Sequence, residues 1–173
     1  MMKRKLVFAI VLAVFLVPWT AAFAHNAAQA DTMPVEIQPA PTASQPTLTS
    51  YGNAIGSIMP GDLFTIDCSG NQADTEFNLY ITNTDELVKS FRYVTMHVGI
   101  YSDNGSGSWE RVTETTDENG PDFYITMQNS RVSFSLPGNT KYKIMVDKGC
   151  FDRYPAIKGQ TTAVPQFYLA TSS

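Results

Sequence analysis

The chain has 173 residues, with 12 Lys and Arg against 16 Asp and Glu, which gives a formal net charge of −4 at pH 7. The basic residues are scattered rather than gathered into a stripe, so the positive surface that a nucleic-acid partner requires is missing. The sequence also contains no G-x-S-x-G, no C-x-x-C and no phosphate-binding loop, and we therefore expect a non-catalytic protein without a cofactor.

Residues 1–24 have the anatomy of a secretory signal peptide. A basic start is followed by an apolar run over residues 6–17, and Ala22, Phe23 and Ala24 match the A-x-A pattern of a cleavage site. The apolar run is about half of the roughly 20 residues that a bilayer core requires. We therefore expect cleavage, no membrane span afterwards, and a protein that is secreted, extracellular or associated with the cell envelope.

The position of the cleavage site decides the charge and the start of the mature protein. Removal of residues 1–24 takes away three cations and no acid, so the net charge falls from −4 to −7. A second acceptable exit at Ala28, Gln29 and Ala30 leaves the start open between His25 and Asp31.

Residues 25–50 are expected to be a flexible linker, because the segment is rich in Ala, Thr, Gln and Pro. Its four prolines interrupt both helices and β-ladders; they are Pro34, Pro39, Pro41 and Pro46. The short stretch 35–37 could nevertheless pair with the edge of a sheet.

Residues 51–173 are typical of an all-β domain, because short runs with period-two alternation are cut by Gly, Pro, Asn and Asp every 8 to 12 residues or so. The strongest predicted strand is 91–102, in which Val94, Met96, Val98 and Ile100 alternate with polar and aromatic residues. A turn at 103–108 and a returning strand at 109–114 complete a hairpin. Further strands are predicted at 63–68, 76–82, 123–127, 131–136, 141–146 and 165–171, with a single helical turn at 85–90.

Two passages resemble immunoglobulin-like domains. Residues 136–146 read L-P-G-N-T-K-Y-K-I-M-V, which is similar to the passage of fibronectin type III domains that carries a tyrosine corner. The resemblance implies that Tyr142 occupies this corner and that its hydroxyl bonds the backbone upstream. Residues 60–68 resemble the B strand of an immunoglobulin domain, although Ile144 stands where such a domain would place its second Cys. The expected fold is an immunoglobulin- or fibronectin-like two-sheet antiparallel β-sandwich.

The two cysteines of the mature chain are Cys68 and Cys150. Export places them in an oxidising compartment, where a lone pair of thiols tends to persist as a disulfide. We therefore predict that these two residues form a bridge.

Three hypotheses about function follow. The leading one is a secreted binding module for an envelope or extracellular protein or carbohydrate, with an adhesive or structural role, whose ligand platform includes Trp109 and Tyr101 beside the hairpin tip. The second is a copper-binding redox protein, because cleavage after Ala24 would expose His25 as a terminal chelator that could join His97 in a three-nitrogen site resembling a histidine brace. The third is a structural subunit that polymerises through a strand edge.

Overall fold

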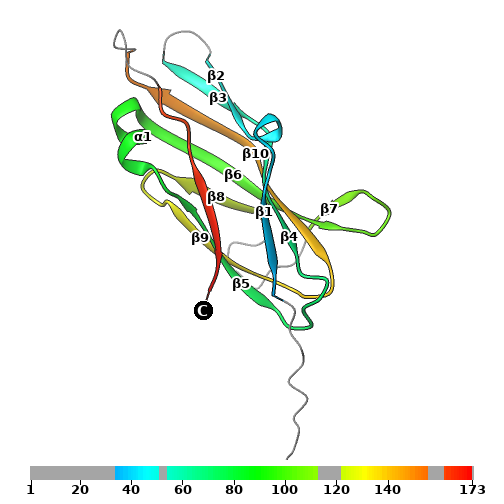
Figure 1. Cartoon of the computed structure of the whole chain (residues 1–173). Helices are drawn as coiled ribbons and strands as arrows, with labels where there is room; N and C mark the ends of the chain where they lie inside the picture. Colours follow the sequence, from blue (N-terminus) through cyan, green and yellow to red (C-terminus); the bar gives the residue numbers. More distant parts are fainter. Residues whose placement is uncertain (1–33, 51–53, 113–121, 156–161, 173) are drawn as a thin grey trace, which may run out of the picture. The chain divides into compact units, whose positions relative to one another are not determined.

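The computed structural model describes residues 34–50, 54–112, 122–155 and 162–172, so the predicted signal peptide and His25 lie outside the described residues. Most of what is described is β-structure, arranged in two antiparallel sheets (Figure 1). The expected all-β sandwich is confirmed at this level. The elements in chain order are β1 (Glu36–Pro39), the 3-10 turn η1 (Thr42–Ser44), β2 (Thr47–Ser50), β3 (Ile55–Met59), β4 (Gly61–Asp67), β5 (Thr75–Ile81), α1 (Thr84–Ser90), β6 (Phe91–Asp103), β7 (Trp109–Arg111), β8 (Asp122–Thr126), β9 (Arg131–Leu136), β10 (Lys141–Arg153) and β11 (Phe167–Thr171).

The larger sheet is built around β10. One edge of β10 pairs with β6, and its other edge pairs first with β4 and then, further along, with β3. Outside these strands, β1 pairs with β4 and β2 pairs with β3. The edge of β6 that faces away from β10 pairs with β7 and β8. The smaller sheet has β5 in the middle, between β11 and β9.

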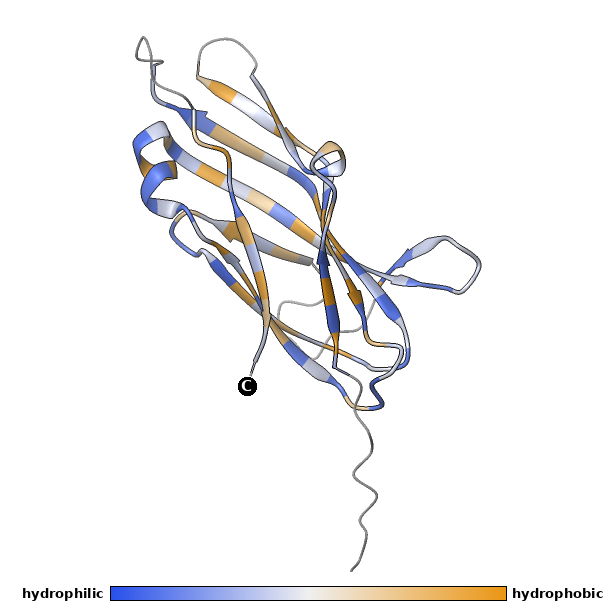
Figure 2. Ribbon diagram, in the orientation of Figure 1, coloured by the Kyte–Doolittle hydropathy of each residue, from blue (hydrophilic) through white to orange (hydrophobic). Residues whose placement is uncertain are grey.

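The core lies between the two sheets and follows from the alternation of the strands. Figure 2 shows hydrophobic residues alternating with polar ones along several of them. Phe123 from the larger sheet stacks on Phe134, whose ring also stacks on Phe77, with ring centroids 5.6 and 5.7 Å apart. The predicted core residues of β6 are almost completely buried: Val94, Met96, Val98 and Ile100.

The predicted hairpin after β6 is confirmed by the pairing of β6 with β7. Its turn contains Gly105 and Gly107, which adopt φ angles of 77° and 84°. Side chains are disfavoured in this left-handed region of backbone conformation, so glycine is the residue that makes this turn.

The predicted linker differs from the structure over residues 34–50. Two strands, β1 and β2, occupy this segment, and the first of them includes two residues of the stretch that could pair with a sheet edge. Both are outer strands of the larger sheet, where one row of N–H groups needs no partner and Pro is tolerated. Pro39 ends β1, while Pro41 and Pro46 flank η1. The domain therefore begins before residue 51.

The predicted disulfide is wrong, because the strand register keeps the two cysteines apart. The backbone N–H of Cys68 donates to the carbonyl oxygen of Thr140, at the start of β10. Cys150 lies ten residues further along the chain, which corresponds to about 30 Å at 3.3 Å per residue. A disulfide needs Cα atoms within about 7 Å. Both thiols are free, that of Cys68 buried and that of Cys150 exposed.

The tyrosine-corner motif and the B-strand resemblance have different outcomes. Tyr142 is buried and its hydroxyl donates to the carbonyl oxygen of Pro137 at 2.9 Å, which is the bond that a tyrosine corner requires. However, β4 is hydrogen-bonded to β10 within one sheet, whereas the B strand of an immunoglobulin domain and the strand after its tyrosine corner lie in opposite sheets. The resemblance of residues 60–68 to a B strand therefore does not extend to their pairing.

Candidate functional site

The outer face of the larger sheet gathers aromatic and charged side chains from four strands. Cross-strand pairing places His97 of β6 opposite Tyr124 of β8, and Tyr101 of β6 between Arg111 of β7 and Lys143 of β10. Directly opposed residues of neighbouring strands project from the same side of a sheet. We call this group the outer face cluster; its members are His97, Tyr101, Trp109, Arg111, Tyr124, Lys143 and Asp147.

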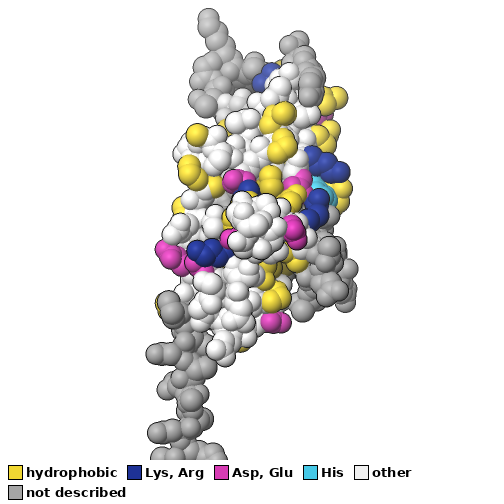
Figure 3. All heavy atoms as spheres, turned by 90° about the vertical axis from the view of Figure 1, so that its right-hand side faces the viewer, with side chains coloured by type: hydrophobic (Ala, Val, Ile, Leu, Met, Phe, Trp, Pro, Cys, Tyr) yellow, Lys and Arg dark blue, Asp and Glu magenta, His cyan; other side chains and the backbone are white. Residues whose placement is uncertain are grey.

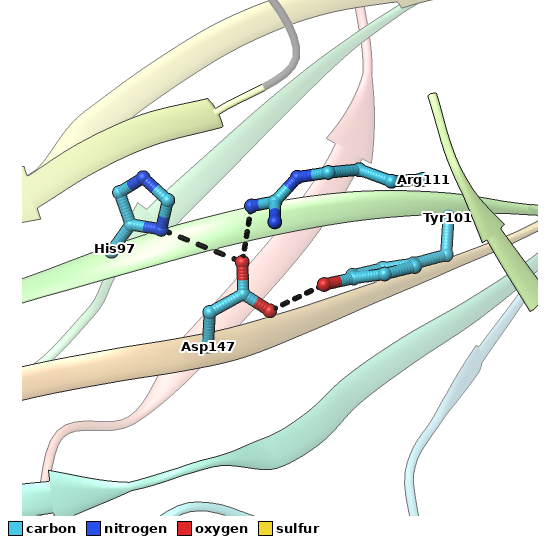
Figure 4. A network of polar contacts seen from close by, with 4 residues as sticks. All are labelled: His97, Tyr101, Arg111 and Asp147. Atoms are coloured by element: carbon cyan, nitrogen blue, oxygen red, sulfur yellow. Dashed lines mark hydrogen bonds and ion pairs between the residues drawn. The ribbon is translucent and has the colours of Figure 1, made fainter. Parts of the chain in front are cut away.

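Asp147 is the centre of the polar contacts in this cluster (Figure 4). One carboxylate oxygen, Oδ1, accepts a hydrogen bond of 2.8 Å from the hydroxyl of Tyr101. The other, Oδ2, lies 2.6 Å from a guanidinium nitrogen of Arg111 and 3.4 Å from Nδ1 of His97. Both oxygens of this half-buried carboxylate therefore face donors or cationic groups.

Two local features of the backbone make room for Asp147. The register of β10 against β6 shifts between Val146 and Lys148, so Asp147 occupies a β-bulge, a device that redirects side chains. On the neighbouring strand, a Cβ atom at Gly99 would collide with the carboxylate of Asp147 and come within 2.8 Å of the Tyr101 ring. A residue larger than glycine would displace this network.

The aromatic rings of the cluster contact its cations. The Lys143 ammonium lies 5.2 Å from the centroid of the Trp109 ring, and the Arg111 guanidinium lies 5.6 Å from that of Tyr101. Such distances are in the range of cation–π attraction. His97 meets Tyr124 edge-on, with ring centroids 4.8 Å apart.

Exposure separates the aromatics that can reach a ligand from the one that supports them. The exposed fraction is 36% for Trp109 and 59% for Tyr124, whereas Tyr101 is half-buried and its hydroxyl is engaged by Asp147. The predicted platform residues Trp109 and Tyr101 therefore lie on one face, but Tyr124 is the more exposed ring. The sequence offers Tyr124 as one of several aromatic residues that could form such a face, but the alternation of β8 does not reveal that this strand pairs with β6 and places Tyr124 opposite His97.

Opposite charges also alternate further along this face. Lys141 Nζ lies 2.9 Å from Asp67, and Lys143 Nζ lies 3.4 Å from Asp62. Hydrogen bonds from Ser69 and then from Lys141 lower the pKa of Asp67 from 3.8 to about 2. Figure 3 shows acidic, basic and hydrophobic side chains interspersed on the side from which β7 projects.

Of the two histidines of the expected copper site, the structure describes only His97. His97 lies beside Asp147 and Tyr124, while His25 is outside the described residues. Within the described ranges, no group of three or more His, Cys, Asp or Glu side chains is arranged to hold a metal ion.

No helix in the described part of the chain is long and apolar enough to cross a membrane.

Comparison of the chain with protein-family models finds no match, and comparison with curated proteins finds none either.

Proposed function

We propose that this chain is a secreted, non-catalytic β-sandwich module that acts by surface binding in the cell envelope or extracellular matrix. The observation that carries the proposal is the exposure of Trp109 and Tyr124 on one face of one sheet. A sheet face with exposed rings offers stacking surfaces to sugar rings or to apolar side chains of a protein. The neighbouring cations and carboxylates would supply hydrogen bonds that orient the ligand.

The state of Asp147 supports a binding role over a catalytic one. A carboxylate that acts as a general base needs a free oxygen within hydrogen-bond reach of its substrate. Here Tyr101 contacts one oxygen, and Arg111 and His97 contact the other. In this proposal Asp147 positions the cluster and does not react.

The immunoglobulin-like type of the sandwich is part of the proposal. If Tyr142 marks the corner, β10 takes the place of strand F, and β6, its neighbour, that of strand C. The pair β5 and β9 in the other sheet then takes the places of B and E. On this assignment, β4 stands beside β10 where the last strand of an immunoglobulin domain would stand.

The experiment that tests the proposal is a binding screen of the exported protein against immobilised cell-wall and matrix polysaccharides and purified envelope proteins. The test variant is Trp109→Ala with Tyr124→Ala, and the matched control is Tyr168→Ala, an equally exposed Tyr on β11 of the smaller sheet. Loss of central interface aromatics typically weakens binding by about tenfold or more.

We expect this loss for the double variant and unchanged binding for the control. Equal binding by the double variant and the wild type would disprove the role of the outer face cluster. An equal loss of binding by Tyr168→Ala would also disprove the role of the outer face cluster, because Tyr168 lies on the smaller sheet.

A further inference from the structure

A second feature, independent of the outer face cluster, is a cavity of about 570 Å³ between the two sheets. It lies where the inner sides of β2, β3 and β4 face the start of α1 and the chain entering β11. Its inner wall includes Ile58, Leu63, Phe64 and Met96, all of which belong to the buried core. The cavity therefore reaches from the surface into the hydrophobic interior.

The size of this cavity is that of a ligand site. The interiors of folded domains are close-packed and hold few voids larger than a water molecule. Sites for small molecules span roughly 300–1,000 Å³ and are lined mainly by apolar side chains with a few polar groups. A cavity of this kind, with several side chains of the core in its wall, provides room for one apolar chain.

The polar groups of the lining indicate the chemistry of the ligand's head. Among the described lining residues, Glu86 is the one acidic or basic residue. The side-chain N–H groups of two other polar lining residues already have acceptors: Asn83 donates to the carbonyl oxygen of Val164 at 2.9 Å and Gln45 donates to that of Ala40 at 3.0 Å. The side-chain oxygen of Asn83 accepts the backbone N–H of Gln166 at 2.9 Å, and the Asn83 amide also donates to Oε2 of Glu86 at 3.4 Å. The group of this lining that complements a cationic head is therefore the Glu86 carboxylate.

We propose that this cavity binds a single-chain amphiphile with a protonated amine head. The aliphatic tail lies against Ile58, Leu63 and Met96, and the ammonium lies at Glu86. Glu86 is exposed on α1, so water screens its attraction for the head, and apolar burial supplies most of the affinity.

The test is calorimetric titration of the exported protein with three ten-carbon probes: decylamine and decanoate below their micelle concentrations, and decanol below its solubility limit. We expect saturable one-to-one binding of decylamine, weaker binding of decanol and the weakest binding of decanoate. Glu86→Gln should lower the affinity for decylamine by about threefold, the size of an exposed charge contribution, and leave decanol binding unchanged.

A cavity-filling variant locates the site. Leu48→Trp places a larger side chain in the wall, and Ala163→Trp does so from the opposite side; either variant, once its β-sheet circular dichroism matches the wild type, should lose binding of all three probes. Tyr93→Ala, which removes an exposed ring of β6 outside the cavity lining, is the control and should bind decylamine as the wild type does. The proposal is overturned if decylamine does not saturate, if decanoate binds as tightly as decylamine, or if a folded filling variant retains affinity. None of these outcomes bears on the outer face cluster, so this inference and the proposed function fail separately.

Discussion

The hydroxyl of Tyr142 donates a 2.9 Å hydrogen bond to the carbonyl oxygen of Pro137, five residues upstream in the chain. The bond closes the loop between β9 and β10 from inside the protein, because the Tyr142 side chain is buried. Burial also raises the pKa of Tyr142 to about 12, so the phenol keeps the proton that it donates at any neutral pH.

Tyr142→Phe should lower the free energy of unfolding by about 1 to 3 kcal/mol, since it leaves the buried carbonyl of Pro137 without its donor. Urea denaturation followed by circular dichroism measures this difference. Tyr168→Phe, which removes a hydroxyl from an exposed ring, should change the free energy by less than about 0.5 kcal/mol. Identical unfolding curves for Tyr142→Phe and the wild type would show that the corner bond contributes nothing.

The two cysteines should differ in reactivity toward iodoacetamide. Cys150 is exposed on β10 and should be alkylated in the folded protein. Cys68 is buried, and burial raises the pKa of its thiol to about 11, so little thiolate is present to react. Mass spectrometry should find one label under native conditions and two in guanidinium chloride.

Cys150→Ser serves as the control for this experiment and should take up no label while folded. An unlabelled monomer whose mass is two hydrogens below that of the reduced chain would contradict the register that separates the cysteines.

Acid should remove a small stabilising contribution of Asp67. Its pKa is lowered by folding, so the ionised carboxylate stabilises the native state above the unfolded pKa of 3.8, and this contribution is lost as the pH falls through about 2. Because the side chain is partly exposed, we expect at most about 1 kcal/mol. The stability difference between the wild type and Asp67→Asn should therefore be largest above pH 3.8 and shrink toward pH 2. A difference that does not vary with pH would rule out this linkage.

Asp147→Asn should lower the free energy of unfolding by about 1 kcal/mol. The substitution removes the charge that faces Arg111 and His97 and weakens the acceptor of the Tyr101 hydroxyl. Thermal unfolding at low salt measures the effect. Asp74→Asn, at an exposed loop position, should stay within about 0.5 kcal/mol of the wild type; a loss of the same size there would assign the effect to net charge and not to the network.

Local patterns in the sequence were sufficient for the strands of the core. Val94, Met96, Val98 and Ile100 follow the period of two that any half-buried strand imposes, and the glycines after Asp103 mark the hairpin. The sequence did not show that the last predicted strand before residue 150 continues to Arg153. The reason is the bulge at Asp147, which interrupts the alternation of buried and exposed residues.

The features that involve residues distant in the chain required the tertiary structure. A proline-rich sequence is compatible both with a linker and with an outer strand of a sheet. For residues 34–50, the pairing of β1 with β4 and of β2 with β3 shows that the segment forms outer strands. A lone pair of cysteines suggested a bridge, but the strand register places Cys68 beside Thr140, just before β10, and Cys150 near the other end of β10.

The sequence by itself determined the all-β class, the alternation of the core strands and the tyrosine-corner motif, because each depends on residues close together in the chain. The tertiary structure decided that Asp147 and His97 meet, that Tyr124 lies beside them, and that a cavity opens between the sheets. Each of these depends on which strands are neighbours and in which register. A register shift of one residue would move every side chain of a strand to the opposite face, and composition or spacing alone leaves that choice open.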